Sequence, residues 1–256
     1  MVADLETAHP GTKAVALPTF NDAESLLQLN FQVKSIARTI KSITDNDADY
    51  DNGYHLVCHS QGGLICRCLT EYMDDQNVDT LVSMAGPQLG VYDDAFFRFF
   101  PTGLQELTLK EIWHVAYNGV AQATLSVANM WNDPNHRDEY LEENTFLPEF
   151  NNVVDPKTQY KDNFLSLKKA VFLVGDIGNS YDGGIGPFQS ALFQYPDANG
   201  TMVDMVDNQV YVEDTFGLRS MDERGDLTLT CVDGISHNQW TNEKATYEKY
   251  VFPWLV

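Results

Sequence analysis

The sequence has few basic residues. It contains 16 Lys and Arg against 37 Asp and Glu, so its formal net charge is −21. A field of that sign repels phosphate groups, which argues against nucleic acid as a partner. No stretch approaches the roughly 20 apolar residues of a membrane span, so we expect no transmembrane segment. Met1 does not begin a signal peptide, because Asp4 and Glu6 fall where the apolar core of a leader would start.

Cysteine is also scarce. The four cysteines, Cys58, Cys66, Cys68 and Cys231, fit no metal-ligand spacing, so we expect no metal site and no cofactor. A disulfide between Cys58 and Cys66 is conceivable, but free buried thiols are the favoured interpretation.

What the sequence does have is length and apolar content for one sizeable core. With 256 residues, of which 43% are hydrophobic, it suits a single domain over residues 1–256 that contains an insertion. Hydrophobic patterning predicts an amphipathic helix over 24–43, a closing helix over 242–250, and short strands over 13–17, 54–57, 80–84, 170–174, 209–212 and 227–232. Strands that alternate with helices indicate an α/β protein with a mostly parallel sheet.

A helical cap insertion is predicted over residues 91–169, between two of these strands. An insertion there lies over the carboxyl ends of the strands, where open α/β sheets place their sites. We expect most of its large apolar side chains to form the core of the cap and a subset to line an apolar groove. They are Phe96, Phe97, Phe99, Phe100, Leu104, Trp113, Tyr117, Met130, Trp131, Phe146 and Phe150.

The most informative motif is the run Cys58-His59-Ser60-Gln61-Gly62-Gly63. It follows the strand over 54–57 and opens a helical pattern, which is the strand–turn–helix arrangement of a nucleophile elbow. Cys58 replaces the first Gly of the usual G-x-S-x-G, and its side chain is small enough to fit. Ser60 is therefore the candidate nucleophile, and the backbone N–H of Gln61 is a candidate donor to a developing oxyanion.

Such a serine needs an acid and a base, in that order along the chain, each after a later strand. Two carboxylates follow the strand over 170–174. We favour Asp182, in a Gly-rich loop, over Asp176, which we expect to accept hydrogen bonds from turn amides. His237 follows the strand over 227–232 and is the candidate base. The other histidines, which we interpret as ordinary structural ones, are His9, His55, His59, His114 and His136.

With these residues placed, the sequence resembles the palmitoyl-protein thioesterase family, and within it the lysosomal, second-type branch. The resemblance extends over nearly the whole chain. It rests on runs that include HLVCHSQGGL (55–64), MDDQNVD (73–79), GPQLG (86–90), WNDP (131–134), YKDNFL (160–165), PFQS (187–190), DTFGL (214–218) and GISH (234–237).

The resemblance implies an α/β-hydrolase fold with Ser60, Asp182 and His237 as catalytic triad and the Gln61 N–H as oxyanion donor. It implies hydrolysis of long-chain acyl thioesters, such as palmitoyl-CoA or an S-palmitoylated protein, with the apolar groove holding the acyl chain. It also implies a lysosomal or secreted glycoprotein, for which Asn199 in Asn199-Gly200-Thr201 is the candidate glycosylation site.

One departure concerns the N-terminus. Family members carry a leader and then a first strand whose His-Gly loop supplies a second oxyanion donor, and this sequence starts after that strand. We therefore expect this chain to be a fragment, truncated at its N-terminus. The missing strand would lie between the segment 13–17 and the strand over 54–57, so we expect a gap at that place in the sheet and an activity that is impaired.

Two alternatives to a thioesterase stay open. The same three residues serve lipases and carboxylesterases that act on oxyesters. A truncated homologue that only binds lipid is the other interpretation. We expect a monomer or a weak oligomer in every case.

Overall fold

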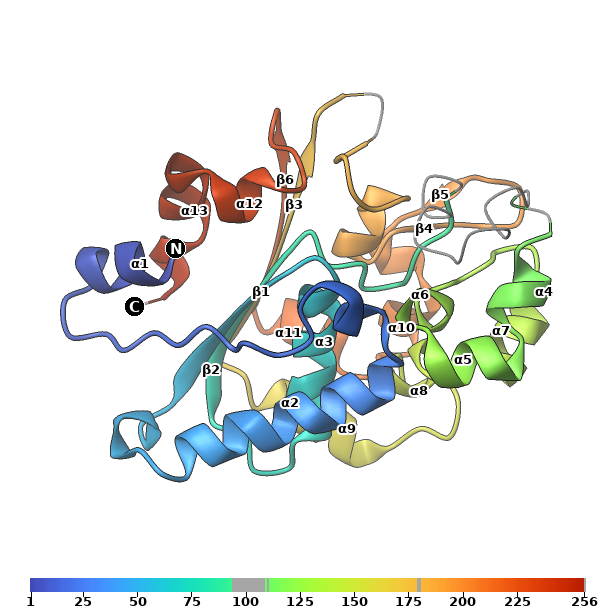
Figure 1. Ribbon diagram of the computed structural model, residues 1–256. Helices are drawn as coiled ribbons and strands as arrows, with labels where there is room; N and C mark the ends of the chain where they lie inside the picture. The colour runs from blue at the N-terminus through green and yellow to red at the C-terminus, as the bar shows by residue number, and fades with distance from the viewer. Residues whose placement is uncertain (94–108, 110, 179–180, 256) are drawn as a thin grey trace.

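The computed structural model describes residues 1–93, 109, 111–178 and 181–255. Its main sheet consists of the parallel strands β1 (Tyr54–His59), β2 (Val78–Met84), β3 (Lys169–Asp176) and β6 (Leu227–Asp233), in the order β1-β2-β3-β6 (Figure 1). A short hairpin pairs β4 (Tyr195–Pro196) with β5 (Met202–Val203). The predicted α/β class and the mostly parallel sheet are confirmed.

Side chains of the inner strands alternate between two buried faces. On β2, Leu81 faces one hydrophobic cluster and its neighbour Val82 faces the other, and Phe172 and Leu173 divide in the same way on β3. A parallel sheet that is covered on both faces requires near-continuous apolar strands, as these sequences are.

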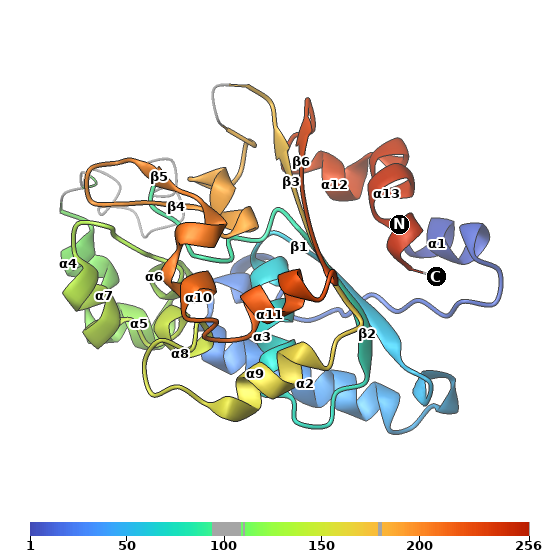
Figure 2. The same ribbon diagram turned by 180° about the vertical axis from the view of Figure 1, so that it is seen from behind.

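One face of the sheet is covered by α3 (Gln61–Tyr72), with α2 (Leu29–Thr44), α9 (Thr158–Leu165) and α11 (Leu218–Glu223) around it (Figure 2). The other face packs against η4 (Phe188–Leu192), α12 (Gln239–Asn242), α13 (Lys244–Tyr250) and η6 (Phe252–Trp254). The chain ends meet there, because Asp4 of α1 (Val2–Ala8) pairs with Lys244 of α13.

Apart from α9, the helices described between β2 and β3 form a cluster beyond one end of the sheet (Figure 1). These are α4 (Trp113–Ala116), α5 (Gly119–Thr124), α6 (Ser126–Asn129), α7 (Arg137–Glu143) and α8 (Leu147–Phe150). Of the apolar residues expected in the cap, Tyr117, Met130, Trp131, Phe146 and Phe150 are buried in the core, and Trp113 packs against it.

The remaining five candidates for a groove, Phe96, Phe97, Phe99, Phe100 and Leu104, lie outside the described residues. The five buried side chains that the structure describes join the cluster that also contains Leu81 of β2 and Phe172 of β3, so they are part of the main core and do not form a separate core of the cap. The acyl groove stays a prediction.

Two predicted strands are wrong. Residues 13–17 run extended without strand pairing, and Gln209–Val212 forms the short helix α10 beside η5 (Met205–Asp207). A strand needs a neighbour for its backbone groups, and neither segment has one. Instead, residues 11–17 face the outer edge of β1 across a hollow of about 710 Å³, which α2 and α3 also line.

One predicted helix begins later than expected. The helix over 24–43 begins only at Leu29, after the 3₁₀ turn η1 (Asp22–Leu26), whereas the closing helix predicted over 242–250 is observed as α13, with α12 as a separate short helix before it. The loop that precedes β1 contains the 3₁₀ turn η2 (Ala48–Tyr50). Helix boundaries depend on capping contacts, such as the Gln28 side chain that accepts the N–H of Phe31, which periodicity does not reveal.

The expectation of free thiols at Cys58 and Cys66 is wrong, because the two form a disulfide that joins the end of β1 to α3. The pair closes across the elbow turn, where the strand end and the second turn of the helix approach each other. Cys68 is a buried free thiol and Cys231 an exposed one.

Candidate active site

Ser60 lies on the turn between β1 and α3. Its backbone has φ of 56° and ψ of −132°, a conformation that L residues rarely adopt and that is typical of a nucleophile elbow. Its N–H donates to the Met84 carbonyl at 2.8 Å, which fixes the turn to the end of β2. At Gly63 a Cβ would overlap the Ser83 hydroxyl, so only glycine permits this contact between helix and sheet.

Asp182 is the candidate acid. Its carboxylate is fully buried, and its Oδ1 accepts the N–H groups of Gly184 and Ile185 at 2.8 Å each. Its Oδ2 lies 2.8 Å from Nδ1 of His237. A carboxylate with two amide donors is held in one orientation, and the remaining oxygen is directed at the imidazole.

His237 connects the acid to the nucleophile. Its Nε2 lies 2.9 Å from the Oγ of Ser60, although the two residues are 177 positions apart. With Nδ1–H donating to Asp182, Nε2 is the acceptor for the serine proton. The backbone reinforces the arrangement, since the His237 N–H donates to the Asp182 carbonyl at 2.6 Å.

Two glycines leave room for the base loop. A Cβ on Gly184 would overlap the ring of His237, and a Cβ on Gly175, near the end of β3, would overlap the Ile235 carbonyl. The competing carboxylate behaves as expected, because Oδ1 of Asp176 accepts the N–H of Gly178 at 2.7 Å in a turn.

The elbow is also tied to the loop before α2, which the sequence did not indicate. The Gln61 side chain donates to the Ser25 carbonyl at 2.9 Å and to the Gln32 side chain at 3.2 Å. Ser126 of the cap donates to the same Ser25 carbonyl at 2.9 Å. The sequence spacing of Gln61, Gln32 and Ser126 does not indicate that these three side chains lie close together.

The Gln61 N–H itself is at the first position of α3, where backbone donors have no partner within the helix. Such an amide can donate a hydrogen bond to a bound oxyanion. That role of the Gln61 N–H stays a prediction.

Four of the five other histidines lie away from the triad. His9 packs edge-on against Phe252, and His55 is on β1 four residues before His59. In the cap, Trp113 is stacked between His114 and His136, and the latter pairs with buried Asp133. His59 differs, because its ring is 4.6 Å from that of His237.

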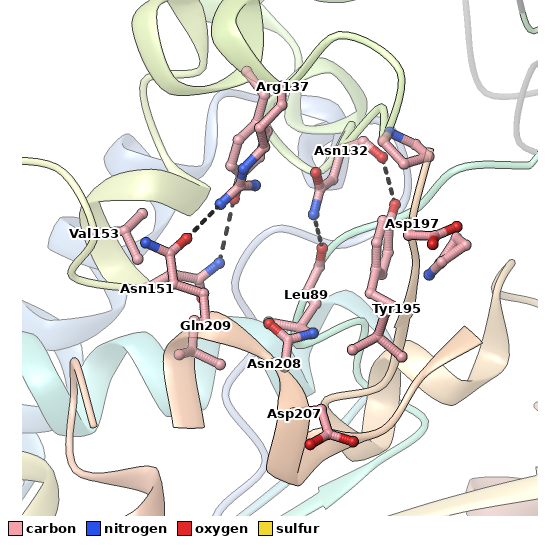
Figure 3. A pocket seen from close by; sticks show the side chains of 15 residues that line it. Leu89, Asn132, Arg137, Asn151, Val153, Tyr195, Asp197, Asp207, Asn208 and Gln209 are labelled. Carbon is pink, nitrogen blue, oxygen red and sulfur yellow. Dashed lines mark hydrogen bonds between the residues drawn. The ribbon is translucent and has the colours of Figure 1, made fainter. Parts of the chain in front are cut away.

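A second hollow lies on the cap side of the molecule (Figure 3). It has a volume of about 260 Å³ and lies between α7, the β4–β5 hairpin and α10. Arg137 spans one wall, where it bonds to Gln209 at 3.1 Å and packs over Tyr140. None of the described residues that line it belongs to the triad, so it is separate from the candidate active site.

The order nucleophile, acid and base on a parallel sheet, with the serine at an elbow between strand and helix, defines an α/β-hydrolase with a Ser-His-Asp triad. Ser60, Asp182 and His237, the three residues selected from the sequence, are brought together by hydrogen bonds.

The family model described as palmitoyl protein thioesterase matches residues 1–237. The lysosomal thioesterase PPT2 of Homo sapiens is 36% identical over 98% of this chain and 80% of the human protein. PPT2-B of Xenopus laevis is 35% identical over 100% of this chain and 86% of its own. Palmitoyl-protein thioesterase 3 of Dictyostelium discoideum is 32% identical over 79% and 68%. The chain therefore belongs to the palmitoyl-protein thioesterase family.

Among solved structures, a monoacylglycerol lipase of Paleococcus ferrophilus matches 87% of this chain and 74% of its own, with 14% identity and a TM-score of 0.41. Within the described part of the chain, no helix combines the length and apolar character that crossing a bilayer requires.

Proposed function

We propose that this protein hydrolyses long-chain fatty acyl thioesters through an acyl-enzyme on Ser60. The observation that carries the proposal is the continuous chain of contacts from Asp182 to His237 to the Ser60 hydroxyl, at 2.8 and 2.9 Å. Family membership supplies the substrate class, because the triad alone does not distinguish thioesters from oxyesters.

In the first step, His237 takes the Ser60 proton while the hydroxyl oxygen attacks the acyl carbon. The negative charge that develops on the acyl oxygen is stabilised by the Gln61 N–H. The carbon–sulfur bond then breaks, and the departing thiolate needs little help from a general acid, since the pKa of a simple thiol is about 8.5. The proton that His237 carries passes to the leaving sulfur, so the imidazole is neutral again and can deprotonate the water that attacks the acyl carbon. His237 then returns this second proton to Ser60 as the fatty acid leaves.

The location we propose is the lysosome or the secretory route. Two features support it. The Cys58–Cys66 disulfide is typical of an oxidising compartment, and the sequon residue Asn199 is exposed in the turn between β4 and β5, where a glycan would meet no obstacle.

The test is turnover of palmitoyl-CoA and of an S-palmitoylated peptide by the wild type and by Ser60→Ala. We expect the variant to lose roughly a thousandfold or more in kcat, because the covalent route is removed. Ser42→Ala, at an exposed position on α2, is the matched control and should keep full activity.

A matched oxyester, measured in the same assay, decides the substrate class. A lower kcat/KM on the oxyester than on the thioester supports the proposal. A preference for the oxyester would reassign the protein to the lipases and carboxylesterases, and undiminished turnover by Ser60→Ala would refute the mechanism.

A further inference from the structure

His59 is the last residue of β1 and directly precedes the nucleophile. Its Nε2 lies 2.7 Å from the carbonyl oxygen of His237. Because a carbonyl oxygen only accepts hydrogen bonds, Nε2 of His59 carries a proton and donates it. The two imidazole rings pack against each other, with centroids 4.6 Å apart and planes inclined by 50°.

This bond completes a clamp on the base. The backbone N–H of His237 donates to the Asp182 carbonyl at 2.6 Å, and its backbone carbonyl accepts from His59. The residue is thereby tied on one side to the acid loop and on the other to the strand that carries Ser60. The 2.9 Å separation of Ser60 Oγ and His237 Nε2 spans two loops that are otherwise remote in sequence.

We propose that His59 is a positioning residue, which holds the His237 loop against the nucleophile elbow through its hydrogen bond to the His237 carbonyl. The inference rests on the proposed function, because it concerns the same triad. His59 does not touch the reacting atoms and acts only through His237.

The electrostatics of the pair fit this role. His237 becomes an imidazolium as it takes the Ser60 proton, so a permanent charge on the neighbouring ring would oppose catalysis. Burial, assisted by the nearby His237, lowers the pKa of His59 to about 4, while Asp182 acts in the opposite direction. His59 therefore donates its hydrogen bond as a neutral ring at pH 5 and above.

The experiment compares His59→Phe, which keeps a ring but loses the donor, with His59→Gln, whose side-chain amide can place an N–H near the position of Nε2. The matched control is His55→Phe on the same strand. Steady-state turnover of palmitoyl-CoA and the rate at which a fluorophosphonate labels Ser60 are measured at pH 5 and pH 7, together with the thermal midpoint.

We expect His59→Phe to lower kcat and the labelling rate roughly threefold to tenfold, the effect of one lost hydrogen bond, with KM within about twofold. His59→Gln should recover most of the loss, and His55→Phe should match the wild type. The proposal is overturned if His59→Phe equals the wild type, or if His59→Gln falls as far as His59→Phe. Ser60→Ala, run in parallel, separates this failure from failure of the triad, since only the latter leaves Ser60→Ala active.

Discussion

The two edges of β1 are built in different ways. Along its inner edge, every residue of the strand has a partner on β2. Along its outer edge, residues 11–17 stand off across the hollow of about 710 Å³. The strand that carries the nucleophile is therefore fixed from one side.

The triad depends on the inner edge. Ser60 is bonded to Met84 at the end of β2, and the loops that carry Asp182 and His237 follow β3 and β6, which extend the sheet in the same direction. The comparison teaches that the hydrogen bonds that join the three residues are made on the inner side of β1, with no contribution from residues 11–17.

The largest expected effect is at Gly184, on the inner side. In Gly184→Ala the added Cβ would overlap the His237 ring, so the imidazole must leave its place between Asp182 and Ser60. We expect kcat to fall by about a hundredfold or more, because misplacing a catalytic group by about 1 Å has that effect. Palmitoyl-CoA turnover measures it.

Gly62→Ala is the matched change beside the outer hollow. A Cβ there meets nothing within 4 Å, and Gly62 lies in a helix where alanine is the better residue. Its kcat should stay within about threefold of the wild type. Equal losses in the two variants would contradict the distinction between the edges.

Stability should show the same contrast. Leu81 on β2 has no exposed surface, and Leu81→Ala is expected to lower the free energy of unfolding by about 3 kcal/mol through lost burial and a cavity. Val15, which lines the hollow, is 49% exposed. Val15→Ala should change the same quantity by less than about 0.5 kcal/mol. Urea unfolding of both variants measures the difference, and a large effect at Val15 would mean that the hollow is closed in solution.

The disulfide is the covalent tie at the outer edge. The double variant Cys58→Ala/Cys66→Ala lacks this bond. Its unfolded chain is then no longer constrained by a closed loop between two residues that are 8 positions apart. The expected loss is about 2 kcal/mol in the free energy of unfolding. Cys231→Ser, which removes an exposed free thiol, is the control and should leave stability unchanged. Reductant should lower the thermal midpoint of the wild type and of this control but not that of the double variant.

The three candidates could be selected from the sequence because each lies in the turn or loop that follows a strand with a clear apolar pattern. Ser60, Asp182 and His237 could be placed from order and turn chemistry alone. The sequence predicted the segments 13–17 and 209–212 poorly, since neither forms the expected strand. The Val-Tyr-Val run at 210–212 suits a strand, yet β propensity depends on having a sheet neighbour, and the segment folds as α10 instead.

Contacts between distant segments were the other failure. Nothing near position 59 shows that a loop 178 residues later will bring a carbonyl to its ring. The helical pattern after Ser60 did not indicate that Arg67 and Glu71 of α3 are both fully buried. Arg67 bonds to Glu71 at 2.8 Å and to the side chains of Gln88 and Asn151 at 3.0 Å.

The buried pair gives a further effect, a dependence of stability on pH. Desolvation raises the pKa of Glu71 from 4.5 to about 7, despite the opposing effect of Arg67. Because the folded pKa lies above the unfolded one, the folded state holds the proton more tightly. The contribution to stability is then fully present below pH 4.5 and is lost as the pH rises through 7, by about 1 kcal/mol for each pH unit in that window.

Glu71→Gln removes the titrating group while it keeps the shape. Thermal and urea unfolding of the wild type should show stability falling from pH 5 to pH 7 more steeply than in Glu71→Gln, and Glu149→Gln, a partly exposed carboxylate paired with Lys157, should retain the wild-type slope. Parallel slopes for all three would mean that water reaches Glu71 and that the inner side of α3 is less well sealed than its contacts indicate. If the stability of the wild type falls more steeply with pH than that of Glu71→Gln, then the burial of Glu71 makes the folded protein more stable at acid pH than at neutral pH.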